Sequence, residues 1–253
     1  MLKAKIDIIE TPSPNFDERT LPVSLLVLHY TGMESGAAAL ERMCDAAAKV
    51  SAHYMVEEDG RIYRLVAEDK RAWHAGVSEW AGETNINSSS IGVEVVNGGH
   101  DWPLPSGDLP PYSDVQINAV IVLCKDIMGR HNIPAVNVLG HSDIAPARKI
   151  DPGEHFPWRG LAAAGLGLWP DVSTSDHEPD RRILFEHGTR DRGVAALQSG
   201  LARIGYGARV TGVYDELTQE IITALQRRFR PDQVDGLVDI ETMELVKWWV
   251  EQL

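Results

Sequence analysis

The sequence predicts an α/β protein with a mixed central β-sheet flanked by helices, plus a small C-terminal three-helix domain. Two patterns support this prediction. Short apolar runs that are typical of buried strands alternate with helical segments along most of the chain. A polar stretch, residues 170–179, then precedes a short internal repeat and is the expected linker. A length of 253 residues also fits one medium and one small domain. We place these domains at residues 1–172 and 180–253.

Local patterns predict each element of the first domain. Apolar runs that are typical of strands buried on both faces occupy residues 24–30, 91–96 and 136–141. Two strand-like halves around Asp59-Gly60 predict a hairpin over residues 52–66. The alanine-rich stretch 35–50 predicts a helix, and four prolines predict a surface loop over 101–112.

A long amphipathic helix is expected after this loop. Ser113 and Gln116 fit a capping box, in which the serine caps the first turn and the glutamine reaches back to the cap. Apolar residues behind the cap recur at helical spacing and form one face. They are Ile117, Val120, Ile121, Cys124, Ile127 and Met128.

The C-terminal domain contains a repeat with a period of 24 residues. Gly212, Asp215 and Thr218 recur as Gly236, Asp239 and Thr242. In each copy a glycine turn precedes an aspartate that can cap the following helix. Together with a helix over residues 194–204, the repeat predicts a small bundle whose core is filled or edged by Trp248 and Trp249.

Net charge and hydropathy limit which partners the protein can bind and where in the cell it can be located. A net charge of −13 repels phosphate backbones, so we exclude nucleic acid as a partner. No stretch approaches the roughly 20 apolar residues of a membrane span. Residues 1–7 become charged again before an apolar run of the length that a secretion signal needs. We therefore expect no membrane insertion and a cytoplasmic location, with the periplasm or cell envelope as the alternative.

Two histidines follow buried strands of the predicted sheet, at residues 29 and 141. In open sheets the functional crevice lies beyond the strand ends, so His29 and His141 can meet there. Asp151 follows ten residues after His141, where a short loop can return it to the same place. Two imidazoles and a carboxylate are a ligand set of catalytic zinc sites, which keep a fourth position open. A strand-end histidine is otherwise a hydrogen-bonded structural residue, and the spacing alone does not decide between the two.

Glu94 stands inside a predicted strand at a position where an apolar residue is expected. A buried carboxylate without a partner either destabilises the fold or has a raised pKa. It can form an ion pair with a nearby lysine or arginine, or act as a general base toward metal-bound water. Lys149 can direct a cation at the oxyanion of a tetrahedral intermediate, or be a solvated surface residue.

The group Trp73-His74-Ala75-Gly76 is either a substrate contact or an aromatic core anchor with a structural histidine.

Five ordered sequence blocks resemble the type 2 N-acetylmuramoyl-L-alanine amidases, which share the fold of the peptidoglycan recognition proteins. The blocks are residues 28–31, 73–76, 85–94, 140–146 and 148–153. The resemblance implies one zinc ion per chain, held by His29, His141 and Asp151, and catalytic roles for Glu94 and Lys149. Residues of the same blocks are assigned to substrate binding, namely Trp73, His74, Ala75, Asn87 and Arg148.

The family resemblance also implies a reaction and a substrate. The expected reaction is hydrolysis of the amide bond between N-acetylmuramic or 1,6-anhydro-N-acetylmuramic acid and L-alanine, in peptidoglycan, its sacculus or soluble muropeptides. Some relatives have a cysteine as third ligand and a catalytic tyrosine in the hairpin. Here Asp151 and Ala52 occupy those positions, and Glu94 would take over the role of the tyrosine. This pattern resembles the bacterial branch that contains the muropeptide-recycling enzyme and its lipoprotein relative.

The C-terminal repeat is similar to the small helical peptidoglycan-binding domain of that lipoprotein relative. We therefore expect that removing this domain near residue 175 leaves activity on soluble fragments but weakens binding to intact sacculi. Two alternatives to the amidase remain open here. One is a non-catalytic peptidoglycan- or muropeptide-binding protein of the same fold, which typically lacks a zinc ligand. The other is a zinc hydrolase that acts on an unrelated amide.

Overall fold

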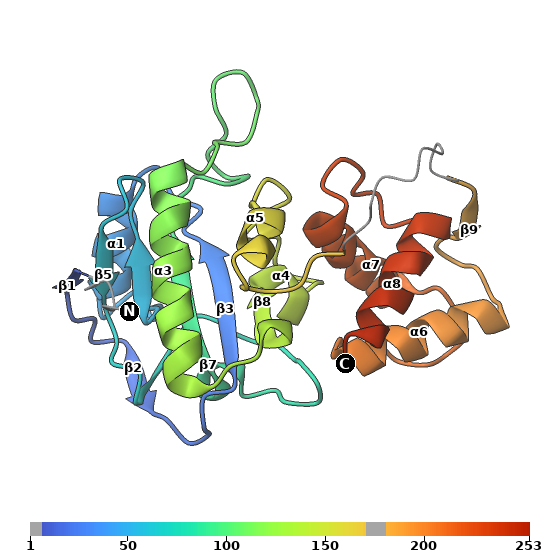
Figure 1. The fold of residues 1–253 in the computed structure, drawn as a ribbon, viewed down its shortest axis with the longest axis horizontal. Coiled ribbons are helices and arrows are strands. Elements are labelled where there is room, and N and C mark those ends of the chain that lie inside the picture. Colours follow the sequence, from blue (N-terminus) through green and yellow to red (C-terminus); the bar gives the residue numbers. More distant parts are fainter. Residues whose placement is uncertain (1–6, 171–180) are drawn as a thin grey trace.

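The structure is a computed structural model that describes residues 7–170 and 181–253. Figure 1 shows a sheet covered by helices and, beyond its β8 edge, a group of C-terminal helices. This arrangement confirms the predicted fold class. The expected charged N-terminus (residues 1–6) and nearly all of the expected linker, with both domain boundaries, lie outside the described residues.

The central sheet has six strands in the order β1-β5-β4-β7-β3-β8. Their bounds are β1 Ile8–Glu10, β3 Leu25–Tyr30, β4 Tyr54–Val56, β5 Ile62–Arg64, β7 Ser90–Val95 and β8 Val138–Gly140. Strands β4, β7, β3 and β8 are parallel to one another, and the predicted β4–β5 hairpin is antiparallel. Gly60 closes that hairpin with a φ of 85°, in the left-handed region that favours glycine.

The remaining elements surround this sheet. Two small two-stranded sheets pair β2 (Phe16–Glu18) with β6 (Lys70–Ala72) and β9 (Ile183–Phe185) with β10 (Val238–Asp239). The helices of the first part are α1 Gly36–Cys44, α2 Ile86–Ser89, α3 Asp114–His131, α4 His141–Ile144 and α5 Trp158–Ala163. The C-terminal helices are α6 Arg192–Ile204, α7 Glu216–Phe229 and α8 Ile240–Glu251.

Strand alternation decides which side chains reach the face of the sheet opposite α3. Leu26 and Leu28 of β3 pack in one hydrophobic cluster with α3, and so does Val93 of β7. Because side chains of a strand alternate between faces, His29 and Glu94 point to the other face. The two residues are also direct partners in the parallel β3–β7 register. Strand geometry therefore places an imidazole and a carboxylate side by side.

Three local expectations differ from the structure. The helix expected over 35–50 ends at Cys44, because the chain turns extended at Asp45. The strand expected over 136–141 is shorter, since residues Ala135–Asn137 form a 3-10 turn and His141 begins α4. Ser113 caps α3 as predicted, but Gln116 does not complete a capping box. Its amide donates instead to the carbonyl oxygens of Val56 and Val96, which attaches the helix to the sheet.

The C-terminal repeat forms the predicted pair of capped helices. The Asp215 and Asp239 side chains accept hydrogen bonds from Thr218 N and Thr242 N, at the starts of α7 and α8. Trp249 is fully buried, in agreement with a core position. The bundle does not have a separate core, however. Its apolar residues form one cluster with residues from the first part, among them Leu25, Leu139 and Ile144.

Candidate metal centre and catalytic site

Three buried side chains meet at the ends of strands β3 and β8. The Nδ1 atoms of His29 and His141 are 2.9 Å apart, and each lies 3.0 Å from Oδ2 of Asp151. The three residues expose 1%, 3% and 5% of their surface, respectively, so little water competes for these atoms. The three donor atoms form a compact group of the kind that can hold a metal ion.

Each of the three is positioned by a different element. His29 is the fifth residue of β3, and His141 begins α4 immediately after β8. Asp151 lies on the loop that follows α4. Its backbone carbonyl oxygen accepts a hydrogen bond from Ser142 N at 2.9 Å. Gly140 permits this return, since a Cβ there would lie 2.8 Å from Pro152 Cδ. The short loop that the sequence suggested after His141 is therefore closed by backbone contacts.

Hydrogen bonds on the outer side of the two histidines determine their tautomers. His141 Nε2 lies 3.1 Å from the Ala75 carbonyl oxygen, which can only accept, so Nε2 carries the proton. His29 Nε2 lies 3.0 Å from His74 Nδ1, and His74 Nε2 lies 3.1 Å from Ser90 Oγ. Ser90 Oγ in turn donates to the Ile86 carbonyl oxygen. A consistent direction along this chain places the proton of His29 on Nε2 as well.

In these tautomers the lone pair of each imidazole is on Nδ1, and the two Nδ1 atoms face each other and a carboxylate oxygen. Lone pairs at these separations repel one another unless a cation lies between them. In a tetrahedral zinc site with bonds of about 2.0–2.1 Å, neighbouring donor atoms are about 3.3 Å apart. The observed separations of 2.9–3.0 Å need only a small expansion to reach that value. The three donor atoms, and the hydrogen bonds that orient the two imidazoles, fit a metal ion.

Burial and charge keep this group in the protonation states that a metal requires. Burial, followed by the neighbouring His141, lowers the pKa of His29 to about 4, so its imidazole is neutral at neutral pH. Burial also lowers the pKa of His74 well below its ordinary value, and His29 adds to this effect. Burial alone would raise the pKa of Asp151, but the two imidazoles outweigh it and hold the carboxyl ionised.

Glu94 lies beside this group on the same face of the sheet. Its Oε2 atom is inaccessible to solvent and has no hydrogen-bond partner among the described residues. Burial raises the pKa of Glu94 well above its ordinary value, the charge of Asp151 raises it further, and Lys149 opposes both. Lys149 is partly exposed and acts on Glu94 through its charge. A carboxyl with a strongly raised pKa beside a metal centre is a candidate proton carrier.

The five residues assigned to substrate binding lie in two different environments. His74, Ala75 and Asn87 are buried, and the Asn87 side chain accepts hydrogen bonds from the backbone N–H groups of His74 and Ala75. Trp73 is partly exposed and donates from Nε1 to Asp17. Arg148 is exposed and donates to the carbonyl oxygens of Ala75 and Val77. His74, Ala75 and Asn87 therefore form the hydrogen bonds that hold the two histidines in place. Trp73 and Arg148 lie at the surface.

Several residues that hold the site were missed in the sequence. Ser90 ends the hydrogen-bond chain behind His29, and His53 lies under His74 with ring centroids 5.7 Å apart. Gly92 makes room for His74, because a Cβ at this position would lie 2.4 Å from His74 Cγ. Gly92 stands two positions before Glu94 on the same strand face. A glycine inside an apolar strand was the available signal, since such a residue often marks a close approach.

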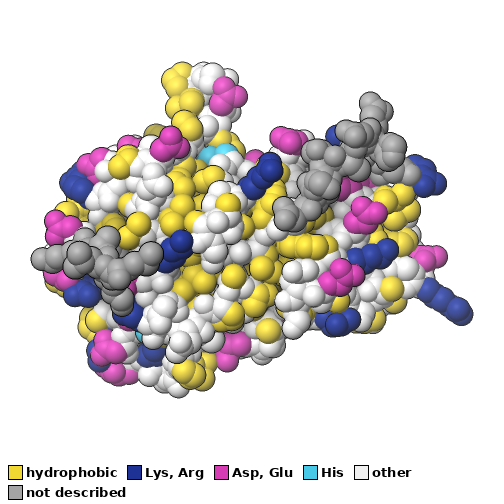
Figure 2. All heavy atoms as spheres, viewed as in Figure 1, with side chains coloured by type: hydrophobic (Ala, Val, Ile, Leu, Met, Phe, Trp, Pro, Cys, Tyr) yellow, Lys and Arg dark blue, Asp and Glu magenta, His cyan; other side chains and the backbone are white. Residues whose placement is uncertain are grey.

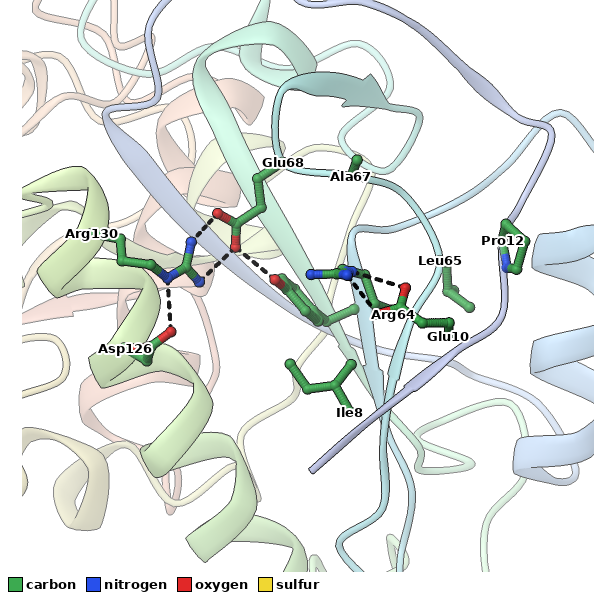
Figure 3. A pocket seen from close by; sticks show the side chains of 10 residues that line it. Ile8, Glu10, Pro12, Arg64, Leu65, Ala67, Glu68, Asp126 and Arg130 are labelled. Atoms are coloured by element: carbon green, nitrogen blue, oxygen red, sulfur yellow. Dashed lines mark hydrogen bonds and ion pairs between the residues drawn. The ribbon is translucent and has the colours of Figure 1, made fainter. Parts of the chain in front are cut away.

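The segment between β7 and α3 continues from the strand that carries Glu94. This segment contains the predicted surface loop and projects from the molecule (Figure 1). Histidine side chains reach the surface at the base of the projection (Figure 2). A cavity of about 540 Å³ lies elsewhere, among β1, β5 and α3, and none of its lining residues belongs to the metal group. Figure 3 shows its charges paired with one another, Arg64 with Glu10 and Arg130 with Glu68.

Comparisons with known proteins agree with this geometry. Residues 19–154 match the family described as N-acetylmuramoyl-L-alanine amidase. Residues 190–246 match a family of peptidoglycan binding domains. The first match contains all five sequence blocks, including His29, Glu94 and Asp151.

Individual relatives resemble nearly the whole chain. The N-acetylmuramoyl-L-alanine amidase AmiD of Escherichia coli (strain K12) is 38% identical over 91% of this chain and 83% of its own length. A solved structure of E. coli AmiD with anhydro-N-acetylmuramic acid-L-Ala-D-gamma-Glu-L-Lys has a TM-score of 0.76, with 36% identity over 91% of this chain and 89% of that one. AMPDH3 from Pseudomonas aeruginosa, in complex with anhydromuramic pentapeptide, has a TM-score of 0.75 and 35% identity over 100% and 99% of the two chains.

Proposed function

The chain belongs to the N-acetylmuramoyl-L-alanine amidase family, and from this premise we propose how its residues perform the reaction. The reaction is hydrolysis of the amide bond between N-acetylmuramic acid, or its 1,6-anhydro form, and L-alanine. One observation carries the proposed mechanism. The Nδ1 atoms of His29 and His141 and Oδ2 of Asp151 all lie within 3.0 Å of one another, in an arrangement that can hold a metal ion.

We propose that this cation is a single zinc ion per chain, with His29, His141 and Asp151 as its ligands. Neutral imidazoles and a carboxylate with an open fourth position are typical of catalytic zinc. When bound, zinc polarises a carbonyl oxygen and lowers the pKa of a coordinated water to about 7. The Ala75 carbonyl and the His74 ring hold the two imidazoles in the tautomers that present Nδ1.

Glu94 and Lys149 are the proposed catalytic side chains of the protein. Glu94 Oε2 would take a proton from the water that attacks the carbonyl carbon and deliver it to the amine as the C–N bond breaks, because an unpartnered carboxyl oxygen is free to do both. Lys149 directs its positive charge toward the oxygen that becomes negative in the tetrahedral intermediate. Its charge already acts on Glu94 in the structure.

Trp73 and Arg148 remain the proposed substrate contacts at the surface of the site. For His74, Ala75 and Asn87 we propose a change of role from substrate binding to support of the metal ligands. The reason is that their polar atoms are already used within the protein. His74 and Ala75 bond to the two histidines, and Asn87 holds the backbone of both.

The substrates are peptidoglycan and muropeptides derived from it. Both solved relatives were bound to anhydromuramic peptides, which supports soluble muropeptides as substrates of this chain as well. The match of residues 190–246 to peptidoglycan binding domains supports polymeric wall material as a further substrate. We propose a catalytic domain at residues 1–172 and a peptidoglycan-binding domain at residues 180–253.

The described part of the chain has no helix that is long and apolar enough to cross a bilayer. The cytoplasmic location remains a proposal, with the cell envelope as its alternative. Fractionation of the source cells, followed by immunodetection, distinguishes the two.

Mass analysis of reaction products tests the proposed function. Anhydro-muropeptide and purified sacculi are each incubated with the protein, with a chelator, and with the chelator followed by added zinc. We expect release of a peptide that begins with L-alanine, loss of that product with the chelator, and recovery with zinc. Binding without release would instead indicate a muropeptide-binding protein, and cleavage of another amide would indicate a different hydrolase.

A further inference from the structure

An arginine of the C-terminal domain is buried inside the catalytic part. Arg228, near the end of α7, donates from Nη1 to Asp143 Oδ2 at 2.6 Å and from Nη2 to the Val138 carbonyl oxygen at 3.0 Å. Its guanidinium also lies 4.1 Å from the centre of the Trp158 ring. All three contacts are made to the first 170 residues. The side chains of Arg228 and Asp143 are only 2% and 1% exposed.

Asp143 connects this arginine to the start of α4. Its Oδ2 atom also accepts a hydrogen bond from Gly140 N at 2.8 Å, and its Oδ1 atom accepts one from Tyr206 Oη at 3.1 Å. Tyr206 follows α6, so two separate segments of the C-terminal domain bond to one carboxylate. Both carboxylate oxygens are thereby used, and charge-assisted bonds of this kind are stronger and shorter than neutral ones.

Helix α4 in turn carries His141, one of the three proposed ligands. It is a single turn of four residues, His141–Ile144, and a helix this short depends on tertiary contacts for its stability. His141 is its first residue, and Ser142 N bonds to the carbonyl oxygen of Asp151. A shift of this turn therefore displaces two of the three proposed ligands together.

We propose that Arg228 is a positioning residue for the metal centre, and that the C-terminal domain thereby completes a site to which it contributes no ligand. Arg228 acts through Asp143, which fixes the turn that presents His141 and anchors Asp151. The inference rests on the ligand assignment of the proposed function. It makes metal affinity dependent on a residue that lies 77 positions beyond the last ligand.

The matched control for Arg228 is Arg230. Arg230 is also buried and forms an ion pair, at 2.8 Å, but its partner Asp239 lies within the C-terminal domain. Arg228→Met and Arg230→Met each remove a buried guanidinium and leave an acceptor aspartate behind. Only the first change removes contacts to the catalytic part. The difference between the two variants isolates positioning of α4 from general loss of stability.

The experiment measures zinc affinity of the full-length chains by competition with a chromophoric chelator. The absorption spectrum of the cobalt(II) form reports ligand geometry. We expect Arg228→Met to lose about tenfold or more in zinc affinity, as is typical for residues that orient ligands. Its cobalt spectrum should change, and kcat on a soluble muropeptide at saturating zinc should fall more than KM rises. Arg228→Lys should recover part of the affinity, and Arg230→Met should keep wild-type affinity and spectrum even if its Tm is lower.

Two results would overturn the inference. One is an Arg228→Met chain that folds and binds zinc as tightly as the wild type. The other is an equal loss of affinity in Arg230→Met, which would indicate a general effect of destabilisation. If Arg228→Met does not fold, Tyr206→Phe removes only the hydroxyl bond to Asp143 and should lose affinity in the same direction. An unchanged affinity in that variant would then count against the proposal.

The outcome is distinguishable from failure of the proposed function. Wild-type protein that binds no zinc would contradict the metal centre itself, and this inference with it. Wild-type protein that binds zinc and cleaves the expected amide, beside an unaffected Arg228→Met, would contradict the positioning role alone.

Discussion

At the scale of single residues, a backbone carbonyl decides the chemistry of the histidine side chains. The Ala75 oxygen sets the tautomer of His141, and a relay through His74 and Ser90 sets that of His29. A histidine in this environment cannot be exchanged for another ligand without losing a partner on its outer side. We expect these outer partners to matter almost as much as the ligands themselves.

The first prediction concerns Glu94. Glu94→Gln keeps the size and shape of the side chain but removes its capacity to carry the proton. We expect kcat to fall by about 10²- to 10⁴-fold, the usual contribution of a general acid–base group. Zinc content, measured by elemental analysis of the same sample, should stay at one ion per chain. A variant with near wild-type turnover would remove Glu94 from the mechanism, and a metal-free variant would assign it a ligand role.

The second prediction concerns His141. Replacing it with alanine removes one of three donor atoms and leaves the other two too few for tight binding. We expect loss of zinc from the purified protein by elemental analysis. Adding zinc to this variant at high concentration should restore little activity, because one ligand is still missing. Full zinc occupancy in this variant would contradict the ligand assignment.

At the scale of elements, the sequence predicted strands and helices well but not their exact contacts. Apolar runs located β3, β7 and β8 within one or two residues, apart from the 3-10 turn that precedes β8. Alternation along β7 would have assigned Glu94 to the same face as His29, had the register been known. The sequence did not contain that register, because pairing between distant strands is a property of the folded sheet.

A third prediction belongs to β7, where Gly92 allows His74 to approach the strand. Gly92→Ala would place a Cβ 2.4 Å from His74 Cγ, so the imidazole must shift from the position in which it bonds to His29. We expect weaker zinc binding in a chelator competition. The control is Gly129→Ala on the exposed side of α3, where a Cβ meets no atom within 4 Å. That change should leave affinity unchanged and raise stability by up to about 1 kcal/mol, because glycine is unfavourable in helices. Equal zinc affinities would contradict the proposed role of His74.

A fourth prediction concerns the attachment of α3 to the sheet through Glu68. Burial would raise the pKa of Glu68, but bonds from Arg130, His131 and Tyr54 outweigh it and lower the pKa to about 2. Figure 3 shows the bonds between Arg130 and Glu68. A lowered pKa stabilises the fold above the unfolded-state value of about 4.5, and this stabilisation is lost as the pH falls toward 2.

The measurement is urea unfolding of the wild type and Glu68→Gln at several pH values. We expect the wild type to be more stable by about 2–3 kcal/mol near neutral pH, and this difference to shrink steadily below about pH 4.5. A difference that does not change with pH would contradict an ionised Glu68 as its origin.

At the scale of the whole molecule, the two expected domains share one hydrophobic cluster. The sequence suggested independent units, since a polar linker and an internal repeat are typical of an appended domain. Local periodicity does not show which surfaces pack together. The pairing of Arg228 with Asp143 also had no signal in the sequence, since two oppositely charged residues far apart are ordinary. The meeting of His29, His141 and Asp151, by contrast, was predictable from the sequence blocks that contain them.

The fifth prediction follows from this shared core. Removal of the C-terminal domain exposes Leu25, Leu139 and Ile144, so a chain of residues 1–170 should have a lower Tm and should aggregate. This expectation is the opposite of the sequence-based one, in which the shortened chain keeps its activity. The control is a full-length chain cut at a protease site inserted between residues 171 and 180. Its two pieces should stay associated in gel filtration and keep activity on soluble muropeptides. An active, monomeric 1–170 chain with unchanged Tm would restore the original expectation.

Helices α6 and α7 of the C-terminal domain share one type of contact but differ at a position beside it. Gln198 of α6 and Gln226 of α7 each bond to the backbone of the following glycine turn. Two residues after each glutamine stand Gly200 and Arg228. Gly200 lets Val246 of α8 approach closely, since a Cβ there would lie 3.0 Å from its Cγ1, whereas Arg228 extends outward. Helix α6 therefore packs against α8 within the bundle, whereas α7 bonds to the catalytic part through Arg228. The two helices therefore differ in role, and Arg228, with Tyr206 and the shared apolar cluster, determines which side of the bundle packs against the catalytic part.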